Sequence, residues 1–145
     1  MAKIIVSRVW RHPRVMWTIL YHTPVLDPLV ILCNSIVCLS TDNEVMSFVA
    51  VKKYGRSYEL GTVYTYPKYR GKGHASSLIK YAVQRYQPIG LLCKKAMISF
   101  YEKLGFCEDS NTLWVLAWRR RLFNIFLQPF RWYPLVSMVY SGKNI

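Results

Sequence analysis

The pattern of apolar and polar positions predicts a series of short strands in the first half of the chain. Residues Lys3 to Val9 alternate loosely, while Ile36 to Leu39 and Met46 to Lys52 are rich in the branched and aromatic side chains that favour strands. The segment Lys53–Ser57 contains a glycine and has the composition of a hairpin turn. It leads into a further predicted strand from Glu59 to Tyr66. The stretch after the first strand is interrupted by Pro13, Pro24 and Pro28, so we expect only short helices there.

The second half combines helical and strand patterns. One apolar stripe has the spacing of an amphipathic helix, formed by Ala75, Leu78, Ile79, Ala82, Val83 and Tyr86. A second stripe ends at Gly105, which we expect in the left-handed conformation with which glycine often closes helices, and consists of Ala96, Met97, Phe100, Tyr101 and Leu104. Short strands are predicted at Ile89–Cys93 and Leu113–Trp118. The pattern indicates a mixed α/β domain, with antiparallel strands first and one βαβ-like crossover.

Composition limits the classes of protein that fit. The chain has 145 residues, of which 52% are hydrophobic, so we interpret residues 1–145 as one domain with a two-layer core. No apolar run has the length of a membrane span, and basic residues interrupt the N-terminal segment, which is therefore unlike a signal peptide. The cysteines lack Cys-x-x-Cys spacing and favour reduced, mostly buried thiols in a cytoplasmic protein: Cys33, Cys38, Cys93 and Cys107.

The charge pattern concerns partners more than fold. The chain contains twenty Lys and Arg residues but only seven Asp and Glu residues, so its net charge is +13. This excess favours polyanionic partners such as a phosphate-bearing cofactor, nucleic acid or an anionic membrane surface. It argues against strongly basic acceptors, because the acidic residues are scattered. The three histidines, His12, His22 and His74, are too dispersed for a metal site, and no metal is predicted.

One glycine-rich motif lies between a predicted strand and a predicted helix. It reads Arg70-Gly71-Lys72-Gly73-His74-Ala75. Such a turn lets backbone N–H groups converge on an anion at the positive end of the helix dipole, which is what a pyrophosphate requires. The alternative is a plain strand-to-helix turn with solubilising Arg and Lys side chains.

A second motif, Phe100-Tyr101-Glu102-Lys103-Leu104-Gly105-Phe106, follows on the next predicted helix. Together the two motifs, in this order of strand, turn and helix, resemble the GCN5-related N-acetyltransferase (GNAT) family over residues 46–106. The resemblance implies a mainly antiparallel sheet flanked by helices. It also implies transfer of an acetyl group from acetyl-CoA to an amine, in one direct step within a ternary complex. The acceptor amine, a small molecule or a protein amine, is left open.

The resemblance assigns the cofactor to the glycine turn. Gly71 and Gly73 would let the backbone approach the phosphates and would adopt a positive φ without strain. N–H donors would come from Lys72, His74 and Ala75, and Ser76 would add a hydroxyl group. Arg70 fits the Gln/Arg position of the family motif. Family members often carry asparagine three residues before the residue that corresponds to Ala96, where it helps to hold the CoA arm. This chain departs from that pattern, because the residue there is Cys93.

Acetyl transfer needs a proton acceptor for the amine, a donor for the carbonyl oxygen and an acid for the departing thiolate. By resemblance, the acid is Tyr101 and the carbonyl oxygen is polarised by a backbone N–H among Val63, Tyr64 and Thr65. Tyr101 also lies on the apolar stripe, so the alternative is a core tyrosine. Glu59 has the spacing of a base glutamate in some histone-type members. Its alternative is an exposed carboxylate at a hairpin edge.

The C-terminal residues 119–145 form a basic and aromatic extension. Arg119, Arg120 and Arg121 precede a run of aromatic and aliphatic residues. We interpret this extension as packing on the domain or forming a homodimer interface. Alternatively, the extension contacts nucleic acid or an anionic membrane. The whole chain would then be a basic binding protein that uses a GNAT-like domain without turnover. A second aromatic group is assigned to the acceptor pocket: Trp10, Trp17 and Tyr21.

Overall fold

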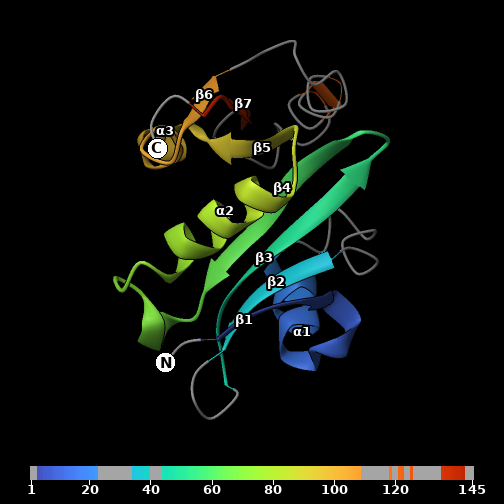
Figure 1. The fold of residues 1–145 in the computed structure, drawn as a ribbon, viewed down its shortest axis with the longest axis vertical. Coiled ribbons are helices and arrows are strands. Elements are labelled where there is room, and N and C mark those ends of the chain that lie inside the picture. Colours follow the sequence, from blue (N-terminus) through green and yellow to red (C-terminus); the bar gives the residue numbers. More distant parts are fainter. Residues whose placement is uncertain are drawn as a thin grey trace. The chain divides into compact units, whose positions relative to one another are not determined.

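The computed structural model describes residues 3–22, 34–39, 44–108, 118, 121–122, 125 and 135–142 (Figure 1). The chain divides into two compact units. The first unit contains residues 1–53 and 60–85, and the second contains residues 54–59 and 86–145. The hairpin of the third and fourth strands therefore contributes residues to both units.

The first unit is built on antiparallel strands. These are β1 (Lys3–Arg8), β2 (Asn34–Leu39), β3 (Val45–Tyr54) and the later part of β4 (Ser57–Thr65). They are hydrogen-bonded in the order β1-β2-β3-β4, and the pairings β1–β2 and β2–β3 are antiparallel. The turn between β3 and β4 contains Gly55 at φ +59°, a backbone conformation that glycine adopts without strain. These four strands and the hairpin confirm the predictions for this part of the chain.

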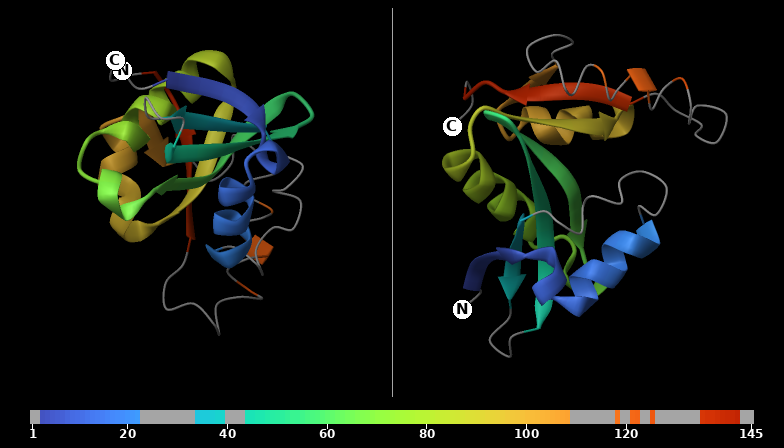
Figure 2. Two further views of the ribbon diagram at one scale, coloured as in Figure 1. Left: turned by 90° about the horizontal axis from the view of Figure 1, so that it is seen from below. Right: turned by 90° about the vertical axis from the view of Figure 1, so that its right-hand side faces the viewer.

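Helices cover both faces of these strands. The short η1 (Val9–Arg11) leads into α1 (Pro13–His22), and η3 (Pro67–Tyr69) precedes α2 (His74–Arg85). Figure 2 shows α1 and α2 on opposite faces of the strands of this unit. Although short helices were predicted here, α1 has ten residues. The physical reason is that Pro13 occupies the first helical position, where its missing N–H group is not needed.

The core of the first unit lies beneath α1. Val15 and Ile19, one helical turn apart, are fully buried with Phe48 of β3. Tyr66 belongs to the same cluster, and its ring lies 6.5 Å from that of Phe48. Helix α2 buries the predicted apolar stripe on the other face of the sheet through Leu78, Ile79, Ala82 and Val83. Burial of each large aliphatic side chain stabilises the fold by about 1.5–3 kcal/mol.

The second unit begins with the first residues of β4. In hydrogen-bonding order these are followed by β5 (Ile89–Lys94), β7 (Leu135–Tyr140) and β6 (Phe106–Glu108). The pairings β5–β7 and β6–β7 are antiparallel. The sequence pattern predicted β5 but neither β6 nor β7. Strand β7 falls within the predicted basic and aromatic extension, and it places Met138 opposite Leu91 of β5.

The second predicted helix is shorter than its apolar stripe. It starts as η4 (Lys95–Met97), and the α-helical part, α3, runs only from Ile98 to Glu102. The following turn closes with tight bonds, because Leu104 N–H donates to Tyr101 O (2.9 Å) and Gly105 N–H donates to Glu102 O (3.0 Å). Gly105 then adopts φ +88°, which confirms its predicted left-handed role.

The remaining predictions concern the C-terminal part. Most of the strand predicted at Leu113–Trp118 lies outside the described residues, and Trp118 itself is helical. Arg119, Arg120 and most aromatic residues of the extension also lie outside the described part of the chain. None of the helices in the described ranges is long and apolar enough to cross a membrane.

Candidate functional site

The glycine turn and the start of α2 form an accessible backbone surface in the first unit. Gly71 and Gly73 adopt φ +75° and +77°, and a Cβ added to either would meet no atom within 4 Å. The N–H groups of the first turn of any α-helix have no partner four residues earlier, and they carry the positive end of the helix dipole. The geometry therefore provides what an anion-binding turn needs, namely an approachable backbone at the N-terminus of a twelve-residue helix.

Hydrogen bonds from Arg70 and Ser47 hold the end of β4 beside this turn. The Arg70 Nε–H group donates to Thr65 O at 3.1 Å, and the Arg70 guanidinium lies 5.9 Å from the Tyr64 ring centre. On β3, the buried Ser47 hydroxyl donates to Tyr64 O and lies 2.9 Å from the Thr65 hydroxyl. Of the strand residues assigned to the cofactor site, Val63, Tyr64 and Thr65, these contacts hold Tyr64 and Thr65 beside the turn.

The Ser77 hydroxyl at the start of α2 forms a hydrogen bond within the turn. Both the N–H group and the hydroxyl of Ser77 donate to Gly73 O, at 3.0 and 3.2 Å. The Ser77 hydroxyl thus stabilises the turn itself. Ala75 and Ser76 are half-buried, while the Lys72 side chain is exposed with its Nζ 5.9 Å from the Tyr69 ring centre.

In the second unit, Tyr101 is almost fully buried. Its ring packs edge-on against Phe100 and Phe106, with centroid distances of 5.1 and 5.8 Å. Burial raises the pKa of the Tyr101 phenol above its ordinary value, and the nearby Cys93 adds a smaller effect in the same direction. The phenol therefore keeps its proton at neutral pH, as a general acid must.

Glu59 and Cys93 also belong to the second unit. Glu59 is only 4% exposed, so the alternative of an exposed carboxylate at the hairpin edge is wrong. Cys93 is buried and its thiol lies 3.6 Å from the Met138 sulfur. Burial first, and the Glu108 charge second, raise the pKa of the Cys93 thiol to about 11. This thiol is thus almost wholly protonated near neutral pH and is a poor nucleophile.

The aromatic residues assigned to the acceptor pocket are strongly exposed. Trp10, Trp17 and Tyr21 expose 55%, 67% and 82% of their surface, on η1 and α1. The Arg11 guanidinium lies 5.4 Å from the Trp10 ring centre. All three side chains are therefore accessible to solvent, and Trp10 has a cation beside it.

Sequence reasoning missed Glu44, Tyr69 and Lys68, which lie beside the glycine turn. The Tyr69 hydroxyl donates to Glu44 Oε2 at 2.6 Å, and the Lys68 ammonium donates to the same oxygen at 2.7 Å. Hydrogen bonds from Lys68, Tyr69 and Arg14, in this order of size, lower the pKa of Glu44 to about 2. The only signal for this group in the sequence was that Tyr69 directly precedes the glycine motif.

The chain belongs to the GNAT acetyltransferase family. The family model described as an acetyltransferase (GNAT) domain matches residues 33–108, which is more than half of the chain. This confirms the resemblance drawn from the two motifs. No curated protein matches the chain in sequence.

Solved structures share the fold at low sequence identity. A GNAT family acetyltransferase from Elizabethkingia anophelis with acetyl-CoA bound has a TM-score of 0.70 and 11% identity, with 97% of each chain covered. The catalytic domain of Tetrahymena GCN5 histone acetyltransferase with coenzyme A has a TM-score of 0.60 and 11% identity, covering 97% of this chain and 93% of that one. Nourseothricin acetyltransferase has a TM-score of 0.54 and 18% identity. The match covers 74% of this chain but only 64% of that protein. The mixed α/β fold, with a mainly antiparallel sheet flanked by helices, is therefore that of the family.

Proposed function

We propose that this protein is an N-acetyltransferase that moves an acetyl group from acetyl-CoA directly to an amine. The observation that carries the proposal is the open glycine turn at the start of α2 in a chain of the GNAT family. Structural neighbours from Elizabethkingia anophelis and Tetrahymena contain acetyl-CoA and coenzyme A. The +13 net charge of the chain adds long-range attraction for such a polyanion.

The turn supplies the groups that fit a pyrophosphate. Backbone N–H groups from Gly71 to Ser76 would face the phosphates, because the two glycines leave their approach open. Lys72 adds an exposed ammonium group. Arg70 is bonded to Thr65 O, so we assign it mainly to shaping the turn. At the end of β4, an N–H group among Val63, Tyr64 and Thr65 would polarise the thioester carbonyl.

The proton chemistry in this proposal is assigned to Glu59 and Tyr101. Acetyl-CoA provides the thioester whose carbonyl carbon the neutral amine attacks. Glu59 would accept the proton that the amine loses as the C–N bond forms, and Tyr101 would donate its proton to the thiolate as the C–S bond breaks. The protonated state of the Tyr101 phenol suits this role. By resemblance, Cys93 stands where family members often carry the asparagine that helps to hold the CoA arm, and its buried thiol stays protonated.

Calorimetric titration with acetyl-CoA, with desulfo-CoA as a control, tests the proposal. Saturable micromolar binding of both would establish the cofactor site, and an amine panel assayed with labelled acetyl-CoA would then identify the acceptor. A folded protein that binds neither compound would contradict the proposal. For the base role, Glu59→Gln should remove the acidic limb of the pH profile of kcat/KM, and an unchanged profile would reject that role.

The exposed aromatic surface favours a second candidate function, which is binding to nucleic acid or an anionic membrane. Trp10, Trp17 and Tyr21 are exposed, and the Arg11 guanidinium lies 5.4 Å from the Trp10 ring centre. Exposed aromatic rings and a nearby cation suit both stacking on bases and insertion among lipid headgroups. Affinity for RNA or for anionic vesicles should then fall steeply with salt and survive Gly73→Val. It should be lost in a variant with Trp10→Ser, Trp17→Ser and Arg11→Gln. Salt-insensitive binding would exclude this candidate.

A further inference from the structure

The glycine turn is held in place by contacts from outside itself. Gly71 and Gly73 have no neighbours where a side chain would lie, and glycine has more backbone freedom than any other residue. A turn with two such residues loses conformational entropy whenever it adopts one binding shape. Preorganisation by neighbouring groups would remove part of that loss before the ligand arrives.

Tyr69 makes the contacts that span this turn. Its ring lies 4.9 Å from the Lys68 ammonium on one side of the turn in sequence. Within the turn, the Lys72 ammonium lies 5.9 Å from the same ring. On the other side of the turn, the Tyr69 ring packs edge-on against the ring of His74, the first residue of α2, at 6.4 Å. The Tyr69 N–H group donates to Tyr66 O at 2.9 Å. One aromatic ring therefore contacts residues both before and after the two glycines.

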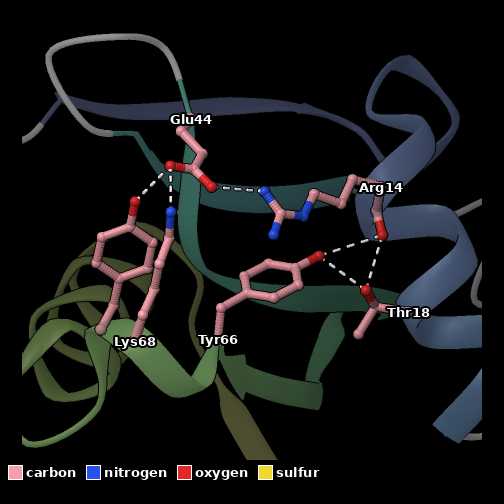
Figure 3. A network of polar contacts seen from close by, with 6 residues as sticks. Arg14, Thr18, Glu44, Tyr66 and Lys68 are labelled. Carbon is pink, nitrogen blue, oxygen red and sulfur yellow. Dashed lines mark hydrogen bonds and ion pairs between the residues drawn. The ribbon is translucent and has the colours of Figure 1, made fainter.

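Glu44 fixes the position of that ring. It lies directly before β3, whose first residues are buried, and its carboxylate lies between the Lys68 ammonium and the Arg14 guanidinium (Figure 3). One carboxylate oxygen accepts a hydrogen bond from the Tyr69 hydroxyl at 2.6 Å. The other carboxylate oxygen accepts from Arg14 of α1 at 2.8 Å. Because the pKa of Glu44 is near 2, the carboxylate is ionised at neutral pH, and a hydrogen bond to an ionised acceptor is about twice as strong as a neutral one.

The same carboxylate separates the roles of two lysines. Lys68 donates to Glu44 at 2.7 Å, so its charge is compensated within the protein. Lys72, on the turn itself, is exposed and contacts the Tyr69 ring face rather than this carboxylate. Lys68 is thus paired with a carboxylate, while the Lys72 ammonium group stays exposed near the Tyr69 ring.

We propose that Tyr69, anchored by Glu44, is the positioning residue of the anion-binding turn. Its ring orders Lys72 and the start of α2 for a pyrophosphate, and Glu44 acts on the ligand only through Tyr69. This inference rests on the proposed cofactor role of the turn for its ligand, but the ordering of the turn is a property of the unliganded protein.

A double-mutant cycle with Glu44→Ala and Tyr69→Phe tests the link. Tyr69→Phe keeps the ring and removes only the hydroxyl, and Glu44→Ala removes its acceptor. Each single variant should weaken CoA binding several-fold, up to about tenfold. The double variant should bind CoA only slightly more weakly than the single variant with the lower affinity. Arg14→Gln is the matched control, because it removes an ion pair to the other carboxylate oxygen and should leave CoA affinity unchanged. The proposal would be overturned if the two single substitutions lowered the affinity for CoA additively, or if Arg14→Gln lowered it as much as Glu44→Ala does.

Amide hydrogen exchange without ligand separates the positioning role from the proposed function. Peptides spanning residues 70–79 should exchange faster in Tyr69→Leu and Glu44→Ala than in wild type and Arg14→Gln. If the wild type binds no CoA but exchange rises as expected, the function is wrong and the positioning role stands. If exchange is unchanged in folded Tyr69→Leu, the positioning role is wrong whatever the affinity for CoA. Circular dichroism of each variant checks folding, and Tyr69→Phe provides the milder change should Tyr69→Leu fail to fold.

Discussion

The ring of Tyr140 covers the backbone of Gly105. A Cβ built on Gly105 would lie 2.9 Å from Tyr140 Cε2, a distance that real Cβ atoms do not tolerate. Gly105 ends the motif on α3, while Tyr140 ends β7, and Ser141 N–H donates to Gly105 O at 2.9 Å. The glycine is thus required both by its φ of +88° and by the strand that lies against it.

Gly105→Ala should therefore destabilise the protein more than the same change at Gly55. Gly55 also has a positive φ, +59°, but its Cβ would meet nothing within 4 Å. We expect Gly55→Ala to cost about 1–2 kcal/mol of unfolding free energy, from backbone strain alone. Gly105→Ala should cost a further 1 kcal/mol or so from the contact with Tyr140, as for other overpacked sites. Urea denaturation of both variants measures the difference, and equal losses would show that Tyr140 yields freely.

Gly73→Ala should weaken CoA binding with little clash inside the protein. Nothing lies within 4 Å of the added Cβ, so the effects left are strain at φ +77° and obstruction of the ligand. Gly55→Ala again serves as the control, because it carries similar strain in another turn. We expect calorimetry to show at least about a tenfold loss of CoA affinity for Gly73→Ala and none for Gly55→Ala. Normal CoA binding by Gly73→Ala would mean that the phosphates bind elsewhere.

Tyr101→Phe separates the acid role from the core role. The variant keeps the ring contacts with Phe100 and Phe106, so the fold should be retained. Loss of a general acid should lower kcat by about 10²–10⁴-fold, with CoA affinity nearly unchanged. Steady-state kinetics over a range of pH values provides the measurement. A kcat equal to that of wild type at every pH would leave Tyr101 as a core residue only.

The contribution of Glu44 to stability should depend on pH in the acid range. Because the pKa of Glu44 in the folded protein, about 2, lies below its ordinary value of 4.5, ionised Glu44 stabilises the folded state above about pH 4.5. That contribution is lost as the pH falls from 4.5 through 2. The difference in unfolding free energy between wild type and Glu44→Gln should therefore shrink across this range, as followed by denaturation at several pH values. A difference that is constant down to pH 2 would contradict the network around Glu44.

The two described cysteines outside β2 should differ in reactivity. Cys107 is exposed, whereas Cys93 is buried with a thiol pKa of about 11. Iodoacetamide at pH 7.5 should modify Cys107 in the folded protein and reach Cys93 only after denaturation. Peptide mass spectrometry identifies the sites. Rapid labelling of Cys93 in the native protein would show that β5 opens readily.

Local pattern was sufficient for one helix and for the hairpin strands. The stripe from Leu78 to Val83 predicted α2, because helical periodicity reflects burial of one face. The strands around the Gly55 turn followed from their composition, since β3 is buried from Val45 to Lys52 and shows no alternation. The two motifs also led to the GNAT family. The glycines of both motifs were predicted for conformations that only glycine adopts easily, and their φ values agree.

What the sequence alone determined were the features set by neighbours along the chain: the periodic helices and strands, the left-handed glycines and the family. Only the tertiary structure revealed that β7 lies between β5 and β6, and that Glu44 and Tyr69 meet across twenty-five residues of sequence. It also placed Glu59 in a buried position where an exposed one was the alternative. Strand pairing, buried charge and hydrogen bonds between distant residues depend on which surfaces meet in space, and no local pattern of side chains encodes that choice.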